Sequence, residues 1–208
     1  NYETFLLEQK VLTQASVDSI REEFKHYIEE SLERGFAEPP VTPNLDDELK
    51  DVYAPHVSMN KTGIDDLPKK EMKLINAITE GLDEGMKRFN NLVLMGQDIA
   101  EYGGAFKVTE GFVDRYGKER VRNTPLCESA IVGAALGLSI KGFKSMMEMQ
   151  FSDFVTVGFN QIINNLAKIH YRWGQNADVV IRMPSGGGVG AGPFHSQSTE
   201  AWFTHTPG

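Results

Sequence analysis

The sequence has little cysteine, no long hydrophobic run and no excess of positive charge. Cys127 is the only cysteine among 208 residues, so no disulfide can form within the chain, which fits a reducing, cytoplasmic location. No leading apolar stretch resembles a signal peptide. The small and apolar run 129–140 has 12 residues, fewer than the about 20 that a membrane-spanning helix needs. These absences predict a cytoplasmic protein that does not enter a membrane.

Charge is distributed unevenly along the chain. Residues 1–68 carry 6 Lys/Arg against 15 Asp/Glu, a net charge of -9, and residues 69–208 carry 15 against 14, a net charge of +1. Nucleic-acid-binding domains present a basic patch or stripe, and neither part has one. The charge pattern therefore argues against a nucleic-acid partner.

The first third of the chain has the pattern of a helix followed by a connection. Ser16 is placed to cap a helix whose apolar positions recur every three or four residues, and Gly35 stands where that helix would end. The stretch "AEPPVTPN" favours extended backbone, and residues 45–68 are polar, acidic and weakly patterned. We interpret 45–68 as a linker, either flexible or lying across another surface.

From about residue 70, short apolar strands alternate with amphipathic helices. Such alternation predicts an α/β fold with a parallel sheet covered by helices on both faces. The expected strands lie at 91–96, 119–124, 143–151 and 178–184, and the expected helices at 70–89, 128–140, 155–173 and 198–206. The chain stops where another strand is expected to begin, so we interpret it as a fragment of a longer polypeptide.

In a parallel sheet, ligands bind beyond the carboxyl ends of the strands, so the loops after each strand are the places to search. The loop "PSGGGVGAGPFHSQS" is rich in glycine, but it contains no GxGxxG, and no GK[ST] follows any glycine in the chain. We therefore interpret it as a loop with unusual backbone angles rather than a phosphate site. His195, near its end, is a catalytic or a structural residue on this pattern alone. GxSxG, HExxH and CxxC are also missing, which argues against serine hydrolase and zinc chemistry.

One carboxylate stands at the head of an otherwise apolar segment. In "RVRNTPLCESAIVGAALGLSIKG", Glu128 begins an expected helix just past the end of an expected strand. It is either a simple partner of the helix dipole or a functional acid. Its neighbours Leu126, Cys127, Ile131 and Val132 predict an apolar pocket, in which a carboxyl group keeps a proton that it can share with a ligand.

Two long stretches together resemble a known family. "LVLMGQDIAEYGGAFKVTEGFVDRYGKERVRNTPLCESAIVGAALGLSIKGFKSMMEMQFSDF" and "VIRMPSGGGVGAGPFHSQSTEAWFTHTPG" resemble the beta subunit of the decarboxylating component of 2-oxoacid dehydrogenase complexes. The resemblance covers residues 70–208 and implies the thiamine diphosphate-binding fold, with 70–208 as its pyrimidine-binding domain. Residues 1–56 resemble the carboxyl-terminal helical tail of the alpha subunit, with 57–69 as a linker, as in a fused alpha–beta enzyme.

The resemblance assigns roles to individual residues. Glu128 matches the glutamate that hydrogen-bonds the aminopyrimidine ring of thiamine diphosphate and provides the proton that activates the cofactor. Leu126, Gln150 and Phe154 match positions around that ring, although many relatives have tyrosine at the position of Phe154. His195 matches a histidine at the substrate end, with a role in acyl transfer to a lipoyl group.

The resemblance also implies what this chain lacks. In the family the alpha half binds Mg²⁺ and the diphosphate through a Gly-Asp-Gly motif, which these 208 residues do not contain, so no metal ligand is expected here. The implied partners are therefore an alpha half or a second copy, in a homo-oligomer or a heterotetramer-like assembly, and a lipoylated acyltransferase. A structural K⁺ near "DVVIRMP" is compatible with the family.

The implied reaction is oxidative decarboxylation of a 2-oxoacid. The residues of "TPLCE" favour a branched-chain substrate of the 2-oxoisovalerate type, while a pyruvate or acetoin dehydrogenase of the same family stays open. A transketolase-like enzyme would share the acid and the cofactor but fits the "HSQSTEAWFTHTPG" loop poorly. The alternative of another class is a non-catalytic assembly fragment that keeps the fold.

Overall fold

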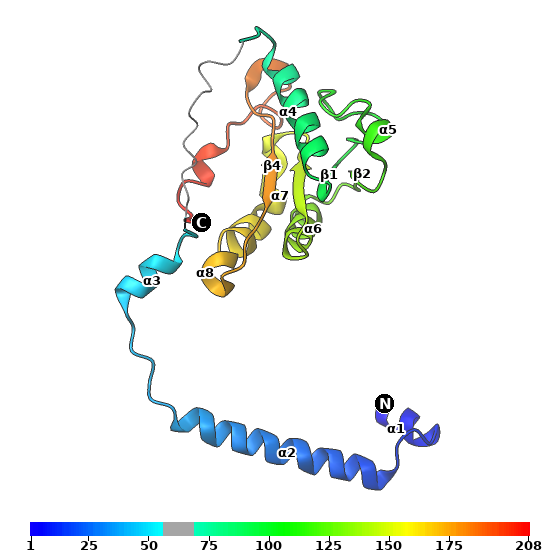
Figure 1. Cartoon of the computed structure of the whole chain (residues 1–208), viewed down its shortest axis with the longest axis vertical. Helices are drawn as coiled ribbons and strands as arrows, with labels where there is room; N and C mark the ends of the chain where they lie inside the picture. Colours follow the sequence, from blue (N-terminus) through cyan, green and yellow to red (C-terminus); the bar gives the residue numbers. More distant parts are fainter. Residues whose placement is uncertain (56–68) are drawn as a thin grey trace. The chain divides into compact units, whose positions relative to one another are not determined.

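A computed structural model describes residues 1–55 and 69–208 (Figure 1). The expected linker 57–69 lies, except for its last residue, outside the described residues. The chain divides into two compact units, residues 1–45 and 46–208. Among the described residues, no helix has both the length and the apolar composition needed to cross a membrane.

The first unit consists of helix α1 (Tyr2–Glu8) and helix α2 (Gln14–Ala37). The N-cap of α2 is Thr13, so the expectation of a Ser16 cap was wrong. Thr13 Oγ1 accepts the Ser16 N–H, and Ser16 Oγ accepts the Thr13 N–H, which makes Ser16 the return half of a capping box. The helix also runs past Gly35 to Ala37 and ends where Glu38, followed by two prolines, turns extended.

Helix α3 (Leu45–Asp51) occupies part of the stretch that was expected to be linker. Its Glu48 accepts a hydrogen bond from the hydroxyl group of Tyr171 in the second unit. The beginning of this stretch is therefore helical rather than unstructured, and residues 46–51 are part of the second unit themselves.

The second unit contains the predicted α/β fold. After α3 its helices and strands follow in the order α4 (Leu74–Arg88), β1 (Leu92–Gly96), α5 (Phe112–Tyr116), β2 (Val121–Asn123), α6 (Glu128–Ile140), β3 (Lys144–Glu148), η1 (Ser152–Phe154), α7 (Val155–Asn160), η2 (Gln161–Leu166), α8 (Ile169–Trp173), β4 (Val179–Arg182), η3 (Gly187–Val189) and η4 (Glu200–Trp202). The four strands form one parallel sheet in the order β2-β1-β3-β4 (Figure 1).

Apolar side chains pack on both faces of this sheet, which confirms the expected architecture. One cluster joins the sheet to α6 and α7; its buried members are Val93, Met95, Ile131, Val132, Ala135, Met147, Met149 and Val155. The other joins the sheet to α4 and α5; its buried members are Met86, Leu94, Ile99, Ala100, Phe112, Val121 and Met146. Neighbouring strand residues alternate between the clusters because successive side chains point to opposite faces.

The expected single helix over 155–173 is three helical segments. Apolar residues spaced by four and three predicted one α-helix, but η2 is a π-helix, in which the Ala167 N–H donates to the Ile162 oxygen at 2.9 Å. The segment is amphipathic, as expected: its exposed polar side chains bond one another, Asn164 to Asn160 at 2.7 Å and Lys168 to Asn164 at 3.1 Å. The last expected helix, 198–206, is reduced to the 3-10 turn η4.

The strands end in register. Gly96, the last residue of β1, pairs with Asn123 of β2 and Glu148 of β3, and Glu148 pairs with Arg182 of β4. Gly96 permits a close approach here, because a Cβ atom at this position would lie 2.7 Å from the backbone oxygen of Glu148. The loops that follow the four strands therefore leave the sheet from one row of residues.

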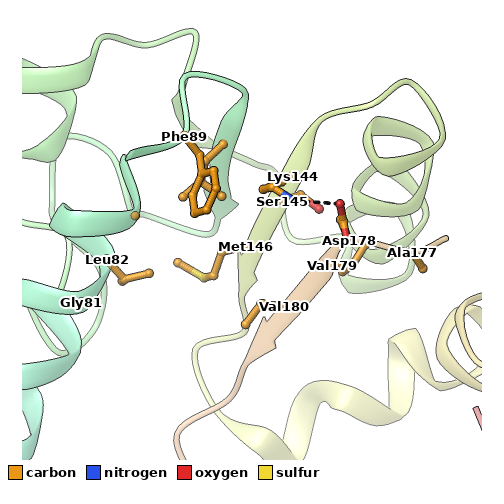
Figure 2. A pocket seen from close by; sticks show the side chains of 12 residues that line it. Gly81, Leu82, Phe89, Lys144, Ser145, Met146, Ala177, Asp178, Val179 and Val180 are labelled. Carbon is orange, nitrogen blue, oxygen red and sulfur yellow. Dashed lines mark hydrogen bonds and ion pairs between the residues drawn. The ribbon is translucent and has the colours of Figure 1, made fainter. Parts of the chain in front are cut away.

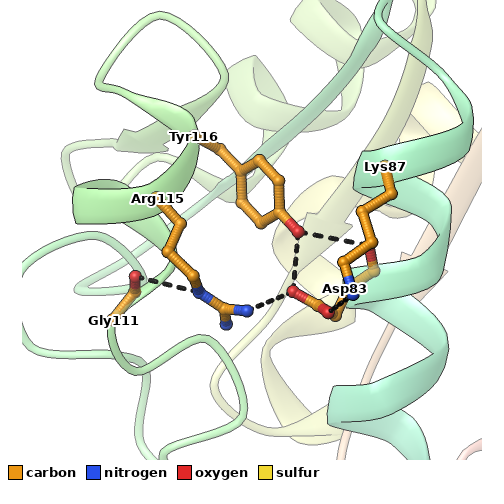
Figure 3. A network of polar contacts seen from close by, with 5 residues as sticks. All are labelled: Asp83, Lys87, Gly111, Arg115 and Tyr116. Carbon is orange, nitrogen blue, oxygen red and sulfur yellow. Dashed lines mark hydrogen bonds and ion pairs between the residues drawn. The ribbon is translucent and has the colours of Figure 1, made fainter.

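A polar network ties α4 to α5 (Figure 3). Asp83 forms ion pairs with Lys87 at 2.6 Å and with Arg115, and the Tyr116 hydroxyl donates to its Oδ1 at 2.6 Å. The hydrogen bonds from Lys87 and Tyr116, with the charge of Arg115, hold the pKa of Asp83 below its usual value, although burial opposes them.

We predict that Gly96→Ala destabilises the complete protein by about 1–3 kcal/mol, because the added methyl group overlaps the Glu148 backbone. The matched control is Gly81→Ala in α4, where an added Cβ meets nothing within 4 Å. This control should instead stabilise the helix by about 0.5–1 kcal/mol. Chemical denaturation measures both, and an unchanged midpoint for Gly96→Ala would contradict the close approach.

We predict that Asp83→Asn lowers stability at pH 7 on the order of 1 kcal/mol, as for a partly exposed ion-pair network. Because folding lowers the pKa of Asp83, its contribution is present above the unfolded value of about 3.9 and is lost as the pH falls through the folded value. Thermal unfolding of both proteins from pH 7 to pH 2 should show the difference shrinking toward zero. Asp114→Asn, at an exposed carboxylate of α5, is the control.

Candidate functional site

The row of strand ends brings three predicted site regions to one edge of the sheet. Gln97 directly follows β1, Glu128 begins α6 after the short loop from β2, and Gln150 lies two residues beyond β3. This arrangement follows from parallel pairing, since the carboxyl ends of parallel strands lie at the same edge.

The carboxylate of Glu128 contacts the end of β1. Gln97 Nε2 donates to Glu128 Oε1 at 2.9 Å, across 31 positions of sequence. The Gln97 side chain is 4% exposed, and its other polar atom, Oε1, is buried with no hydrogen-bond partner among the residues described. A buried amide oxygen without a partner is unfavourable, so this point of the sheet edge has unused capacity to bind a donor.

The apolar pocket expected around Glu128 is only partly supplied by this chain. Ile131 and Val132 lie in the core beneath α6, but the Leu126 side chain is 80% exposed and does not cover the carboxylate. Glu128 itself is half-buried. Within the described residues, the apolar surroundings of the acid are thus supplied by the α6 side, whereas Leu126 is exposed to solvent.

Gln150 lies beside the loop that follows β1. Its Nε2 approaches Asp98 Oδ2 at 3.5 Å, the long limit of a hydrogen bond. Asp98 has a φ of 58°, a left-handed conformation that aspartate tolerates, and its backbone oxygen accepts the Gly104 N–H at 2.8 Å. The loop after β1 thus lies against the loop after β3 at the candidate site.

An aromatic cluster lies beyond Gln150. The His195 ring packs edge-to-face on Phe151, with centroids 4.9 Å apart, and on Phe154, with centroids 5.4 Å apart. Phe106 packs edge-on against Phe151 at 5.8 Å. The fold therefore joins two predicted site residues, Phe154 and His195, that are 41 positions apart in the sequence.

A buried ion pair lies at the same edge. Glu148, 2% exposed, bonds Arg182 Nη1 through its Oε2 at 2.5 Å. Burial raises the pKa of Glu148, and the charge of Arg182 opposes that rise. The sequence pointed to the loops that contain Gln97 and Phe151 as places to search but gave neither residue a role, and it did not point to Glu148 or Arg182. The positions of Glu148 and Arg182 as the last residues of β3 and β4 were the available signal.

A separate groove lies at the opposite end of the sheet (Figure 2). Its volume is about 420 Å³, and its lining includes Leu92, Lys144 and Val179, the first residues of β1, β3 and β4. Lys144 and Asp178 form an ion pair of 2.9 Å at its edge (Figure 2). None of the predicted site residues lines this groove.

The residues at the carboxyl edge fit a flat heteroaromatic ring with hydrogen-bonding atoms. Glu128 supplies a carboxylate, the orphaned Gln97 oxygen marks unused hydrogen-bonding capacity beside it, and Phe154 belongs to the aromatic cluster that follows Gln150. A metal site does not accompany them: within residues 1–55 and 69–208, no three His, Cys, Asp or Glu side chains gather as ligands.

Comparison with known families places the fold in a defined class. Residues 70–208, the larger part of the chain, match the family described as "Transketolase, pyrimidine binding domain". The chain therefore belongs to the transketolase pyrimidine-binding domain family.

The similar proteins are named as beta subunits of 2-oxoacid dehydrogenases. The chain is 43% identical over 143 residues to a mitochondrial 2-oxoisovalerate dehydrogenase subunit beta of Dictyostelium discoideum, covering 67% of this chain and 38% of the relative. It is 43% identical over 139 residues to the 2-oxoisovalerate dehydrogenase subunit beta of Bacillus subtilis, covering 66% and 42%. It is 41% identical over 140 residues to a pyruvate dehydrogenase E1 component subunit beta of Staurastrum punctulatum, covering 66% and 43%.

These matches confirm the resemblance to beta subunits of thiamine diphosphate-dependent 2-oxoacid dehydrogenases. The chain spans about two-fifths of the length of these curated relatives.

Proposed function

We propose that this chain forms the pyrimidine-binding side of a thiamine diphosphate site in a 2-oxoacid dehydrogenase, most specifically one for branched-chain 2-oxoacids. The observation that carries the proposal is the Gln97–Glu128 hydrogen bond, which places a carboxylate at the start of α6 beside the carboxyl end of β1. Family membership supports the cofactor class, and the relatives named above support the reaction class.

Glu128 is the proposed acid of the site. Gln97 holds one carboxylate oxygen, and no donor among the described residues bonds the other, Oε2, which leaves it for a ring nitrogen of the cofactor. Shared protonation with that nitrogen adjusts the acidity of the ring, as general acid–base catalysis requires. Thiamine diphosphate, when bound, supplies the nucleophilic carbon and the electron sink for decarboxylation.

Three further residues are proposed to position the cofactor ring. Phe154 offers an aromatic face for stacking, but it lacks the hydroxyl group that a tyrosine would place there. Gln150 provides amide hydrogen bonds at the edge of the ring, next to Asp98. Leu126 contributes its backbone, and its exposed side chain is available to contact the other half of the site.

The proposed overall reaction transfers an acyl group to a lipoyl group on an acyltransferase. Carbon dioxide leaves the 2-oxoacid, the remaining acyl carbon is oxidised, and the lipoyl disulfide is reduced to one thiol and one acyl thioester. His195, held between two phenylalanine rings, is proposed to orient or protonate the acyl-bearing group during this transfer.

The other half of the site must come from outside the described residues. The sequence contains no Gly-Asp-Gly, so Mg²⁺ and the diphosphate are proposed to bind an alpha half or a second copy. The exposed Leu126 side chain fits such an interface. A potassium ion near β4 would be compatible with this assembly.

Residues 1–56 are proposed to be an alpha-subunit-like tail joined to the beta-like part. The long capped helix α2 and the compact unit ending at Leu45 are compatible with a tail of this kind. Residues 46–55, near the end of this proposed tail, belong to the same compact unit as the beta-like part.

We predict that Glu128→Gln in the complete enzyme still folds but loses turnover by about 10²–10³-fold, because the amide cannot exchange a proton. Calorimetric titration with thiamine diphosphate and Mg²⁺ tests the cofactor assignment first, on the wild-type assembly. Glu119→Gln, at an exposed position before β2, is the control and should keep wild-type turnover. Absence of cofactor binding by the wild type would refute the proposed function, and full turnover of Glu128→Gln would refute the proton role.

We predict that the complete enzyme has a higher kcat/KM for 2-oxoisovalerate than for pyruvate, by about tenfold, as differential binding of a branched apolar side chain allows. The leucine and cysteine of "TPLCE" support this choice, whereas the similar identities to relatives of both kinds do not separate them. Steady-state kinetics with both substrates decides it. Preference for pyruvate would overturn the branched-chain assignment and leave the reaction class in place.

A further inference from the structure

The loop that carries His195 makes few backbone hydrogen bonds within itself. Gly186, Gly190 and Gly192 have positive φ angles, and residues 187–194 are exposed. Within this loop the structure gives one firm backbone bond, from Gly190 N–H to the Gly187 oxygen at 3.0 Å, and a longer one from His195 N–H to the Gly192 oxygen at 3.4 Å. A glycine-rich segment with so few bonds has high conformational freedom, so the place of His195 must be set by contacts from elsewhere.

Those contacts come from the 3-10 turn η1 after β3. Ser152 Oγ donates to the Gln197 backbone oxygen at 2.8 Å, and the Gln197 N–H donates to Asp153 Oδ1 at 3.3 Å. Both backbone polar groups of one residue, two positions after His195, are therefore held by two adjacent side chains. Ser152 is 2% exposed and Asp153 is 8% exposed, whereas Gln197 is exposed, so the two bonds attach a surface residue to buried side chains of η1.

The start of the loop is fixed by the same turn. The Ser152 N–H donates to the Pro184 backbone oxygen at 2.8 Å. The turn η1 therefore binds the chain at Pro184, just after β4, and again at Gln197. The glycine-rich segment is the part of the loop between these two hydrogen-bonded residues. His195 lies near the second of these points, where its ring is packed between Phe151 and Phe154.

Asp153 also has a buried polar atom that no described residue bonds. Its Oδ2 is buried and has no hydrogen-bond partner among the described residues, and the same holds for Ser196 Oγ beside the attached peptide. A buried carboxylate with one unpaired oxygen lowers stability relative to a neutral amide of the same shape. Groups that depart from a local rule in this way are expected at functional or strained positions.

We propose that Ser152 and Asp153 are positioning residues, which hold the Gln197 backbone so that the His195 imidazole faces the acyl group during transfer to lipoyl. This inference rests on the proposed function. It assigns no substrate contact to Ser152 or Asp153; they act on the reaction only through the placement of His195.

The test uses the complete assembly and two assays. Decarboxylation is measured with an artificial electron acceptor, and reductive acylation with a lipoylated domain. His195→Ala, Ser152→Ala and Asp153→Ala should each lower acylation by about tenfold or more while decarboxylation changes less than about twofold. Asp153→Asn keeps an oxygen that can accept the Gln197 N–H and should stay within about twofold of wild type in both assays. Ser198→Ala, at an exposed position of the same loop, is the control.

A double-mutant cycle separates positioning from general damage. If Asp153 acts only through His195, then Asp153→Ala combined with His195→Ala should acylate no more slowly than His195→Ala alone. The inference would be overturned if the losses of acylation rate in the two single variants added in the double variant. It would also be overturned if Asp153→Ala lowered the decarboxylation and acylation rates by the same factor. Asp153→Asn should also match or exceed the thermal stability of the wild type; a loss as large as that of Asp153→Ala would show a structural role instead.

The same measurements distinguish failure of the inference from failure of the proposed function. A wild-type assembly that neither binds thiamine diphosphate nor decarboxylates a 2-oxoacid would refute both. Normal wild-type activity in both assays, together with an unaffected Asp153→Ala, would refute the positioning role alone.

Discussion

The arrangement of the candidate site depends on one constraint, the register of four parallel strands that end in a single row. Asn123, Gly96, Glu148 and Arg182 are the last residues of their strands and pair with one another in that order. The absence of a side chain at Gly96 permits the close approach of β1 and β3. Because the strands end together, every loop that leaves them begins at the same edge, and residues far apart in sequence become neighbours there.

The edge so formed is proposed to be one half of a site. Its acid is bonded on one side by Gln97, yet Leu126 is exposed beside it, and the amide oxygen of Gln97 has no partner among the described residues. An interface with another protein half would bury the exposed apolar group at this point. A cofactor ring held in that interface would give the unsatisfied polar group a hydrogen-bond partner. The need for partner residues, proposed from the missing Gly-Asp-Gly, thus has a physical counterpart in the structure.

The sequence predicted much of the fold because local patterns and global fold agree. The run Leu92–Gly96 was recognisable as a buried strand and Glu128–Ile140 as a helix, since apolar content and turn residues bound both. The prediction failed where two local solutions compete. Thr13 and Ser16 both suit an N-cap, and the spacing of 155–173 suits an α-helix and a helix with a π-turn equally.

The sequence by itself determined the class of the chain and the parallel α/β architecture, because two long stretches resemble one family and the local apolar periodicity predicts alternating strands and helices. Through that resemblance it also led to the proposal of Glu128 as the acid. Only the tertiary structure decided that Gln97 bonds Glu128, that Phe151 and Phe154 enclose His195, and that Ser152 and Asp153 hold Gln197. The physical reason is that hydrogen bonds and ring contacts act over a few ångströms of space. Their partners here are separated by 31 to 45 positions of chain, which no local pattern relates.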